Sequence, residues 1–201
     1  MNYDKKKYVF LVRHGETIYN INRRLQNSED RLTERGKEQI KALAKELSIF
    51  KFTKFFSSDE RRALESSELI SKEINLSFEK NNLIKEKSSG ELSGKFISEV
   101  DWSEVKGDFY NKKISGGESV NDVIKRAKNF FEIIKSSNND KILVVSHGSF
   151  LRVLFCIMTN NDVKEYLLNY EFPNASYIIL LKEGNKWEIR KSEMIKKTQN
   201  E

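Results

Sequence analysis

Cysteine, proline and histidine are scarce in this chain, which has one cysteine, one proline and two histidines among its 201 residues. A single cysteine, Cys156, excludes an internal disulfide and a cysteine-based metal cluster. Its setting in "FLRVLFCIMT" is typical of a buried thiol. The lone proline, Pro173, marks no domain boundary. We therefore expect one domain spanning residues 1–201, a length that can bury a substantial core.

Long apolar runs are also lacking. No stretch approaches the roughly 18 to 20 apolar residues that would span a bilayer. The start, "MNYDKKKYVFLV", places lysines before an apolar run that is too short for a signal-peptide core and has no small-residue cleavage site after it. We expect a cytoplasmic protein with no membrane partner.

The chain has little excess of one charge. Its 36 basic and 30 acidic residues give a net charge of +6, and the two signs are interspersed. Nucleic-acid binding would need the basic residues clustered on one face, so we expect no nucleic-acid partner. Two histidines without a carboxylate cluster or an H-x-x-x-H spacing indicate no metal site, and we expect no cofactor. Nothing fixes the oligomeric state, and a homodimer stays open.

Apolar periodicity organises the chain into alternating strands and helices. Strands are expected at 7–13, in "TKFFSS" and "KILVVS", and in a closing hairpin of "ASYIILLKE" and "KWEIRKS" across Gly184-Asn185. Helices are expected in "TERGKEQIKALAKELS", with Thr33 as N-cap, in "DERRALESSELISKEI", from 120 to 134, and after "VVSHG". Residues 87–117 are expected to be irregular, with one or two helical turns. The predicted inward helix positions are Ile40, Leu43, Ala44, Leu47, Leu64, Leu69, Ile70, Val120, Val123, Ile124, Ala127, Phe131 and Ile134.

This alternation predicts an α/β fold, a three-layer sandwich with a mainly parallel central sheet and helices on both faces. In such sheets ligands bind beyond the carboxyl ends of the strands. Candidate functional residues are therefore sought where strands end.

Both histidines follow a strand and precede a glycine. "VFLVRHGETIYN" leads from a buried strand into Arg13 and His14, and "VVSHG" ends in the same way on His147. Arg62 stands near the start of the helix after the second strand, at the same edge of the sheet. Arginine offers forked donors for phosphate oxygens. These four residues predict a pocket for a dianion, although each histidine could instead be a hydrogen-bonded strand cap.

Five blocks carry a resemblance to a known family. "LVRHGET" with Asn20 after it, "LTERG", "FSSDERRA", "SGGES" and "VVSHG" are similar, in order and spacing, to the histidine phosphatase superfamily. The similar branch contains the cofactor-dependent phosphoglycerate mutases and the phosphatase domain of the bisphosphatase that hydrolyses fructose 2,6-bisphosphate. The resemblance covers about residues 8 to 180 and implies the phosphoglycerate mutase-like form of the α/β sandwich.

The resemblance implies that His14 is the nucleophile and forms a phosphohistidine. It implies that Arg13, Arg62 and His147 hold the phosphoryl oxygens, with Asn20 and Gly148 also at the substrate. The physical chemistry agrees, because neighbouring guanidinium charges disfavour the imidazolium and keep His14 neutral near pH 7. The same cations can stabilise charge on the transferring group without a metal.

The resemblance also implies a carboxylic acid that protonates the leaving group. In "LIKEKSSGELSGK", Glu86 falls at the family's proton-donor position, although Leu92-Ser93 replaces the usual aromatic residue that precedes a glycine. Glu91 is the competing carboxylate. Glu118 in "GGES" is expected to support the site rather than to transfer a proton.

The middle of the chain favours a phosphatase over a mutase. Phosphoglycerate mutases that the chain resembles are longer, and adjacent arginines bind the substrate carboxylate. Between Gly94 and Gly117 this chain has no arginine, and its basic residues there are Lys95, Lys106, Lys112 and Lys113. The sequence thus predicts a metal-independent phosphatase whose partner is a small phosphorylated metabolite. A phosphoglycerate mutase, or a catalytically silent relative that binds phosphate or a phosphoprotein, are the alternatives.

Overall fold

A six-stranded sheet runs through the centre of the structure, a computed structural model that describes residues 6–198. The strand order is β3-β2-β4-β1-β6-β7. Strands β3, β2, β4 and β1 run parallel to one another, β6 runs antiparallel to β1, and β7 runs antiparallel to β6. The mainly parallel α/β sheet predicted from the sequence is thereby confirmed. The strands are β1 (Lys7–Arg13), β2 (Lys54–Ser57), β3 (Glu79–Lys80), β4 (Lys141–Ser146), β6 (Tyr177–Glu183) and β7 (Lys186–Ser192).

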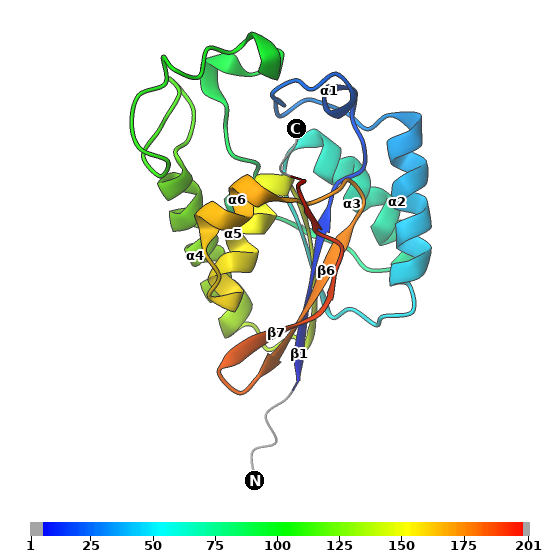
Figure 1. The fold of residues 1–201 in the computed structure, drawn as a ribbon. Coiled ribbons are helices and arrows are strands. Elements are labelled where there is room, and N and C mark those ends of the chain that lie inside the picture. The colour runs from blue at the N-terminus through cyan, green and yellow to red at the C-terminus, as the bar shows by residue number, and fades with distance from the viewer. Residues whose placement is uncertain (1–5, 199–201) are drawn as a thin grey trace.

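Helices cover both faces of the sheet, as predicted. Figure 1 shows α2 and α3 on one side and α4, α5 and α6 on the other. Successive side chains of β1 point alternately to the two faces of the sheet. Val9 and Leu11 belong to the core under α4 and α5, whereas Phe10 and Val12 belong to the core under α2 and α3. The helices are α2 (Glu34–Leu47), α3 (Arg61–Ile74), α4 (Val120–Ser136), α5 (Gly148–Thr159) and α6 (Val163–Asn169).

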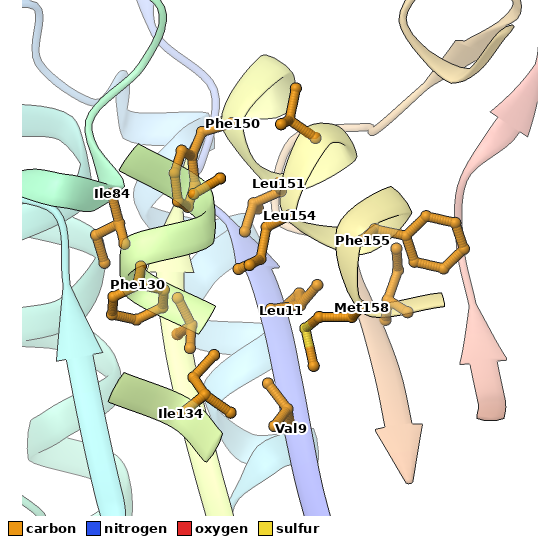
Figure 2. Packing of buried hydrophobic residues seen from close by; sticks show 14 of the residues in the cluster. Val9, Leu11, Ile84, Phe130, Ile134, Phe150, Leu151, Leu154, Phe155 and Met158 are labelled. Atoms are coloured by element: carbon orange, nitrogen blue, oxygen red, sulfur yellow. The ribbon is translucent and has the colours of Figure 1, made fainter. Parts of the chain in front are cut away.

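The core under α4 and α5 is rich in aromatic side chains. Phe130 of α4 packs edge-on against Phe150 of α5 with ring centroids 6.3 Å apart, and both are fully buried (Figure 2). Cys156 lies in the same core, where burial raises the pKa of its thiol to about 12. The prediction of a buried thiol is therefore confirmed.

The predicted inward faces of α2 and α4 are largely confirmed. All four predicted positions of α2 are buried, and Thr33 caps it by accepting a hydrogen bond from the Gly36 amide. In α4 the positions Ile124 and Phe131 are half-buried against the core, and the fully buried Phe130 was not predicted.

The face of α3 differs from the prediction. Ile70 is buried, but Leu64 and Leu69 are only half-buried. The face of α3 that lies closest to the strand ends instead carries small residues, Ala63, Ser66 and Ser67, all fully buried. The reason is close approach to the strand ends, because Ser66 Oγ accepts from the Gly15 amide at 3.2 Å and Ser67 Oγ donates to Ser57 Oγ at 2.7 Å.

Several short elements were not predicted, among them the first helix, α1. Residues 87–117 are irregular with two single turns, η2 (Gly90–Leu92) and η3 (Ile97–Glu99), as expected. This segment lies beside the turn after α1, where the Gly94 amide donates to the Leu25 carbonyl at 2.7 Å, and both stand at one end of the molecule in Figure 1. The elements that were not predicted are α1 (Ile18–Ile21), β3, α6, η1 (Asn82–Ile84), β5 (Tyr170–Glu171) and β8 (Ile195–Lys196).

Within residues 6–198, none of the helices is long and apolar enough to cross a membrane. The hairpin of β6 and β7 across Gly184-Asn185 is confirmed by its antiparallel register, in which Glu183 faces Lys186.

Candidate active site

Strand register brings the two histidines together. Arg13, the last residue of β1, is paired with Ser146, the last residue of β4, so the residues that follow leave the same edge of the sheet. The His14 amide donates to the Ser146 carbonyl at 3.0 Å, and the imidazole rings of His14 and His147 have centroids 5.2 Å apart. The fold therefore brings together the two histidines that the sequence assigned to one site.

The hydrogen bonds of His14 determine which of its ring nitrogens is unprotonated. Arg62 Nε lies 3.2 Å from His14 Nε2 and can only donate, so Nε2 carries a lone pair. The proton then resides on Nδ1, which donates to the Gly15 carbonyl at 2.7 Å. This tautomer presents an unprotonated Nε2, the form of imidazole that can attack phosphorus.

Both imidazoles are held neutral. Burial and the positive charges of Arg62 and Arg13 lower the pKa of His14 well below its ordinary value near 6.5. Burial and the charge of Arg62 lower the pKa of His147 in the same way. The expectation that guanidinium charges keep His14 neutral is confirmed in direction, with burial as the larger cause.

Arg62 is the centre of the polar network. It comes from the first turn of α3, and its side chain is 1% exposed. Besides the bond to His14, Nη1 donates to the Asn27 carbonyl at 2.7 Å and Nη2 to Glu60 Oε2 at 2.5 Å. A guanidinium held by three partners cannot turn freely, so its donors are aimed before any ligand arrives.

Arg13 lies against the helix that follows His147. Its guanidinium packs over Gly148, where an added Cβ would come within 3.4 Å of Nε. Nη1 donates to the Phe172 carbonyl at 2.5 Å, whereas Nε is buried without a partner among the described residues. Burial lowers the pKa of Arg13 to about 10, so the group is still a cation at neutral pH.

Asn20 lies beside the loop that carries His14 rather than against the histidine rings. Its Oδ1 accepts from the Thr17 amide and from Asn174 Nδ2, both at 3.1 Å. Asn174 Nδ2 also lies 3.2 Å from the His14 carbonyl, so it ties Asn20 to the loop. Asn174 was not predicted, and an asparagine next to the only proline resembles an ordinary turn residue in sequence.

Glu86 lies at the amino end of α5. Its Oε1 accepts from the Phe150 amide at 3.2 Å and from the Lys87 amide at 2.8 Å, and its Oε2 accepts from the Ser149 amide at 3.2 Å. Glu91 is exposed and accepts from a serine hydroxyl instead. Both carboxylates line a cavity of about 660 Å³ that also reaches Arg62. Glu86 is therefore the better fixed of the two predicted candidates.

Glu118 and Arg126 clamp the segment that carries Glu86. Arg126 donates Nε to Glu118 Oε1 at 2.8 Å and Nη2 to Glu118 Oε2 at 3.0 Å. The same guanidinium donates to the carbonyls of Lys85 and Glu86 at 2.7 and 3.1 Å. This geometry agrees with the supporting role expected for Glu118. Arg126, on a helix with other exposed charges, gave no sequence signal.

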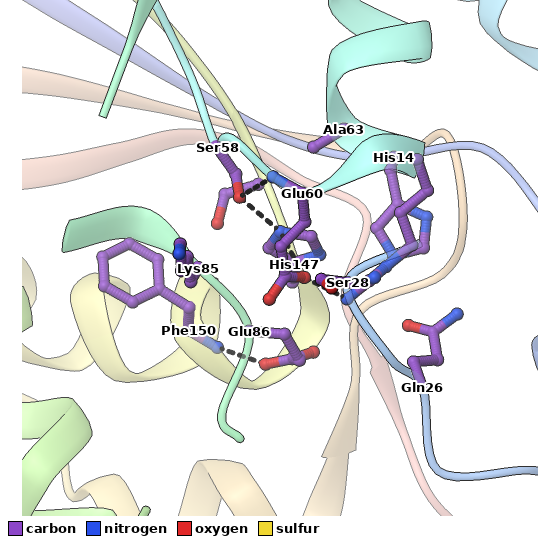
Figure 3. A network of polar contacts seen from close by, with 12 residues as sticks. His14, Gln26, Ser28, Ser58, Glu60, Ala63, Lys85, Glu86, His147 and Phe150 are labelled. Atoms are coloured by element: carbon purple, nitrogen blue, oxygen red, sulfur yellow. Dashed lines mark hydrogen bonds and ion pairs between the residues drawn. The ribbon is translucent and has the colours of Figure 1, made fainter. Parts of the chain in front are cut away.

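Two further polar residues that the sequence did not single out contact His147. Ser58 Oγ lies 2.8 Å and Glu60 Oε2 3.3 Å from His147 Nε2. Figure 3 shows Ser58 and Glu60 beside His147, with Glu86 and His14 close by. Within the part of the chain that the structure describes, no three histidine, cysteine or acidic side chains form a metal-binding group.

The sequence profile of the histidine phosphatase superfamily (branch 1) matches residues 9–194. The chain belongs to this superfamily, and its phosphatase-named relatives support a phosphomonoesterase. The family resemblance stated from the five sequence blocks is thus confirmed.

Particular relatives cover most of the chain. It is 32% identical over 180 residues to phosphoserine phosphatase 1 of Hydrogenobacter thermophilus, covering 86% of this chain and 85% of that one. It is 30% identical over 198 residues to the metal-independent phosphoserine phosphatase of Arabidopsis thaliana, covering 90% and 79%. The crystal structure of the alpha-ribazole phosphatase from Shigella flexneri superposes with a TM-score of 0.82 over 91% and 94% of the two chains, at 19% identity. At that identity the structure supports the fold alone.

Proposed function

We propose that this chain hydrolyses small phosphomonoesters without a metal, through a phosphohistidine on Nε2 of His14. The observation that carries the proposal is a neutral His14 whose Nδ1 donates to the Gly15 carbonyl and whose unprotonated Nε2 lies 3.2 Å from Arg62 Nε. A nucleophile and a fixed cation beside it are the two requirements of phosphoryl transfer to an imidazole.

The proposed roles of the other residues are those that the family resemblance implies, and their positions support them. Arg13, Arg62 and His147 are assigned to the phosphoryl oxygens, with Asn20 and the Gly148 backbone at the edge of the substrate. Glu86 is assigned to protonate the leaving alkoxide. As the phosphorus–oxygen bond to the leaving group breaks, a bond from Nε2 to phosphorus forms, and water later hydrolyses that bond to release phosphate.

The experiment combines a chelator with variants of the site. An aryl phosphate should be hydrolysed at an unchanged rate in excess chelator, and His14→Ala should abolish turnover. Arg62→Ala and His147→Ala should each lower kcat/KM by at least ~100-fold, the scale of losing one transition-state donor. Glu68→Gln, an exposed change on α3, is the control. Activity that needs added metal, or a folded and fully active His14→Ala, would overturn the proposal.

For the substrate we propose a phosphomonoester with a carboxylate near its phosphate, of the phosphoserine type. Two relatives carry that substrate in their names. Lys87 supports the proposal from the cavity wall, because it is half-buried beside Glu86 and has no ion-pair partner within 4.0 Å in residues 6–198. Its neighbour Lys85 is already paired with Asp59 at 3.3 Å. Burial lowers the pKa of Lys87, a cost that an anionic substrate group would offset.

Phosphoserine and phosphoethanolamine, which lacks the carboxylate, separate this proposal from unspecific hydrolysis. We expect Lys87→Met to erase the preference for phosphoserine and Lys85→Met to keep it. Equal kcat/KM for both compounds in the parent chain would refute the carboxylate assignment while leaving the phosphatase intact. Incubation with a phosphoglycerate, analysed for its positional isomer, tests the mutase alternative.

Two broader expectations remain proposals. One sheet shared by both core layers supports a single domain over residues 1–201. The cytoplasmic location stays a prediction, and the oligomeric state stays open.

A further inference from the structure

Glu60 is a half-buried carboxylate beside the residues assigned to the phosphoryl group, and the mechanism does not use it. Its side chain is 12% exposed, in the turn between β2 and α3, and it makes no capping hydrogen bond to its own helix. Nothing about "SSDERRA" distinguishes it from an ordinary acidic residue at a helix start. In the fold, however, it faces two of the three donors assigned to the phosphate, Arg62 and His147.

Its Oε2 lies where those donors converge. Arg62 Nη2 is 2.5 Å away and His147 Nε2 is 3.3 Å away. Ser58 Oγ lies 2.8 Å from the same His147 nitrogen, and the low pKa of this histidine keeps its ring neutral beside the Glu60 carboxylate. An oxygen bound to the Arg62 guanidinium and lying next to an imidazole nitrogen occupies the position that a phosphoryl oxygen needs.

We propose that Glu60 is an internal carboxylate ligand of the phosphoryl site, which the phosphate dianion must displace or meet in its protonated form. Glu60 thereby sets the affinity of the site for anions and makes that affinity depend on pH. The inference rests on the proposed function in assigning this site to a phosphoryl group.

The charges around Glu60 decide the direction of the pH effect. Arg62 and, more weakly, Lys85 favour the carboxylate, whereas burial and the nearby carboxylate of Glu86 oppose it, and the net result is a raised pKa of Glu60. His147 is neutral and does not titrate in this range. As pH falls through the pKa of Glu60, the competing charge disappears, so a dianion should bind more tightly.

Sulfate is the probe, because it stays a tetrahedral dianion between pH 5 and 9 and its binding can be followed by calorimetry without turnover. We expect the parent chain to bind sulfate more tightly as pH falls. Glu60→Gln should bind it at least about tenfold more tightly than the parent at pH 8, with little pH dependence, since a like charge next to the anion is gone. Glu68→Gln makes the same change of net charge on the exposed side of α3 and should match the parent.

The direction of the change separates this role from simple anchoring of Arg62. If Glu60 only held the guanidinium in place, Glu60→Gln would weaken sulfate binding, and that result would overturn the proposal. Arg62→Ala should abolish binding, and sulfate bound equally well by that variant would place the anion elsewhere and also overturn it. Thermal melts show that each variant is folded. A chain that binds sulfate as expected but hydrolyses nothing would reject the proposed function and leave the Glu60 inference standing.

Discussion

At the scale of single residues, the site divides into groups with a motif and groups without one. Arg13, His14 and His147 could be predicted because each occupies a fixed place at a strand end, and Arg62 because it follows a strand in a recognisable block. Glu60 could not, since only the folded chain brings the residue two before Arg62 back onto that guanidinium.

Ser58, Asn174 and Arg126 were missed for a related reason. Their functional contacts join segments distant in sequence, such as Ser58 to His147 across 89 positions. Serine, asparagine and arginine are common in turns and on helices, so their residue type alone predicts no such contact.

The first prediction concerns Glu86 and the leaving group. An aryl phosphate leaves as a weakly basic phenoxide, whereas an alkyl phosphate leaves as a strongly basic alkoxide and depends on a general acid. Glu86→Gln should therefore lower kcat/KM for an alkyl phosphate by roughly 10² to 10⁴ and spare much of the aryl reaction. Because kcat/KM reports steps up to the first irreversible one, breakdown of the phosphohistidine does not confuse the comparison.

Glu91→Gln is the matched control, since that carboxylate lines the same cavity but lies at its exposed wall. It should leave both substrates nearly unaffected. Equal losses for both substrate types in Glu86→Gln would reject the proton-donor role, and a selective loss in Glu91→Gln would move the role to that residue.

At the scale of elements, the strands and long helices were predicted well because the period of their apolar residues and their capping residues indicate the same boundaries. Thr33 accepts from the Gly36 amide, and β1 and α2 begin and end within a residue of the expected positions. The elements that were missed are short, such as α1 and β3, and too few residues repeat in them to give a period. The predicted inward face of α3 was confirmed for Ile70 and in part for Leu69, which packs against the core, whereas its tightest contacts are made by serines.

The loop after β1 and the start of α2 meet without room for a side chain. A Cβ on Gly36 would come within 2.1 Å of the Glu16 carbonyl oxygen, and one on Gly15 within 2.5 Å of the Gly36 carbonyl oxygen. These atoms belong to the backbone and cannot move aside cheaply. The two glycines thus let α2 hold the loop that carries His14.

The second prediction follows from this contact. Gly36→Ala should lower the free energy of unfolding by about 1–3 kcal/mol, the range of overpacking, and should also reduce kcat/KM because the loop with His14 is pushed outward. Urea unfolding and aryl phosphate kinetics measure the two effects. Lys41→Ala, an exposed change on the same helix, should alter stability by less than about 0.5 kcal/mol. A Gly36→Ala chain as stable as the parent would show that the contact can relax.

At the scale of the whole molecule, the parallel strands explain why distant motifs meet. The ends of β1, β2 and β4 lie at one edge, so residues near positions 14, 62 and 147 converge although the chain between them forms both helical layers. The cost of this arrangement is that two imidazoles are fully buried among arginines. That cost makes the stability of the whole fold depend on pH.

The sign of this dependence is fixed by the lowered pKa values. In the unfolded chain the histidines take up protons as pH falls below about 6.5, whereas in the folded chain His14 and His147 stay neutral to much lower pH. Protons therefore bind the unfolded state preferentially, and stability that is present above pH 6.5 is lost as pH falls toward the folded pKa. The raised pKa values of Glu60 and Asp30 act in the opposite direction.

The third prediction isolates the histidine contribution by difference. Each buried neutral histidine should cost up to about 1.4 kcal/mol per pH unit below 6.5, so about 2 kcal/mol between pH 7 and pH 5. His147→Asn removes one titrating group, and its free energy of unfolding should fall by about that much less than the parent's over the same interval. Asn174→Ala changes a polar side chain near the same loop without changing titration and should keep the parent's pH dependence. Urea unfolding at the two pH values gives all three slopes. A His147→Asn chain with the parent's slope would mean that His147 takes up its proton in the folded state as readily as in the unfolded chain, contrary to its burial beside Arg62.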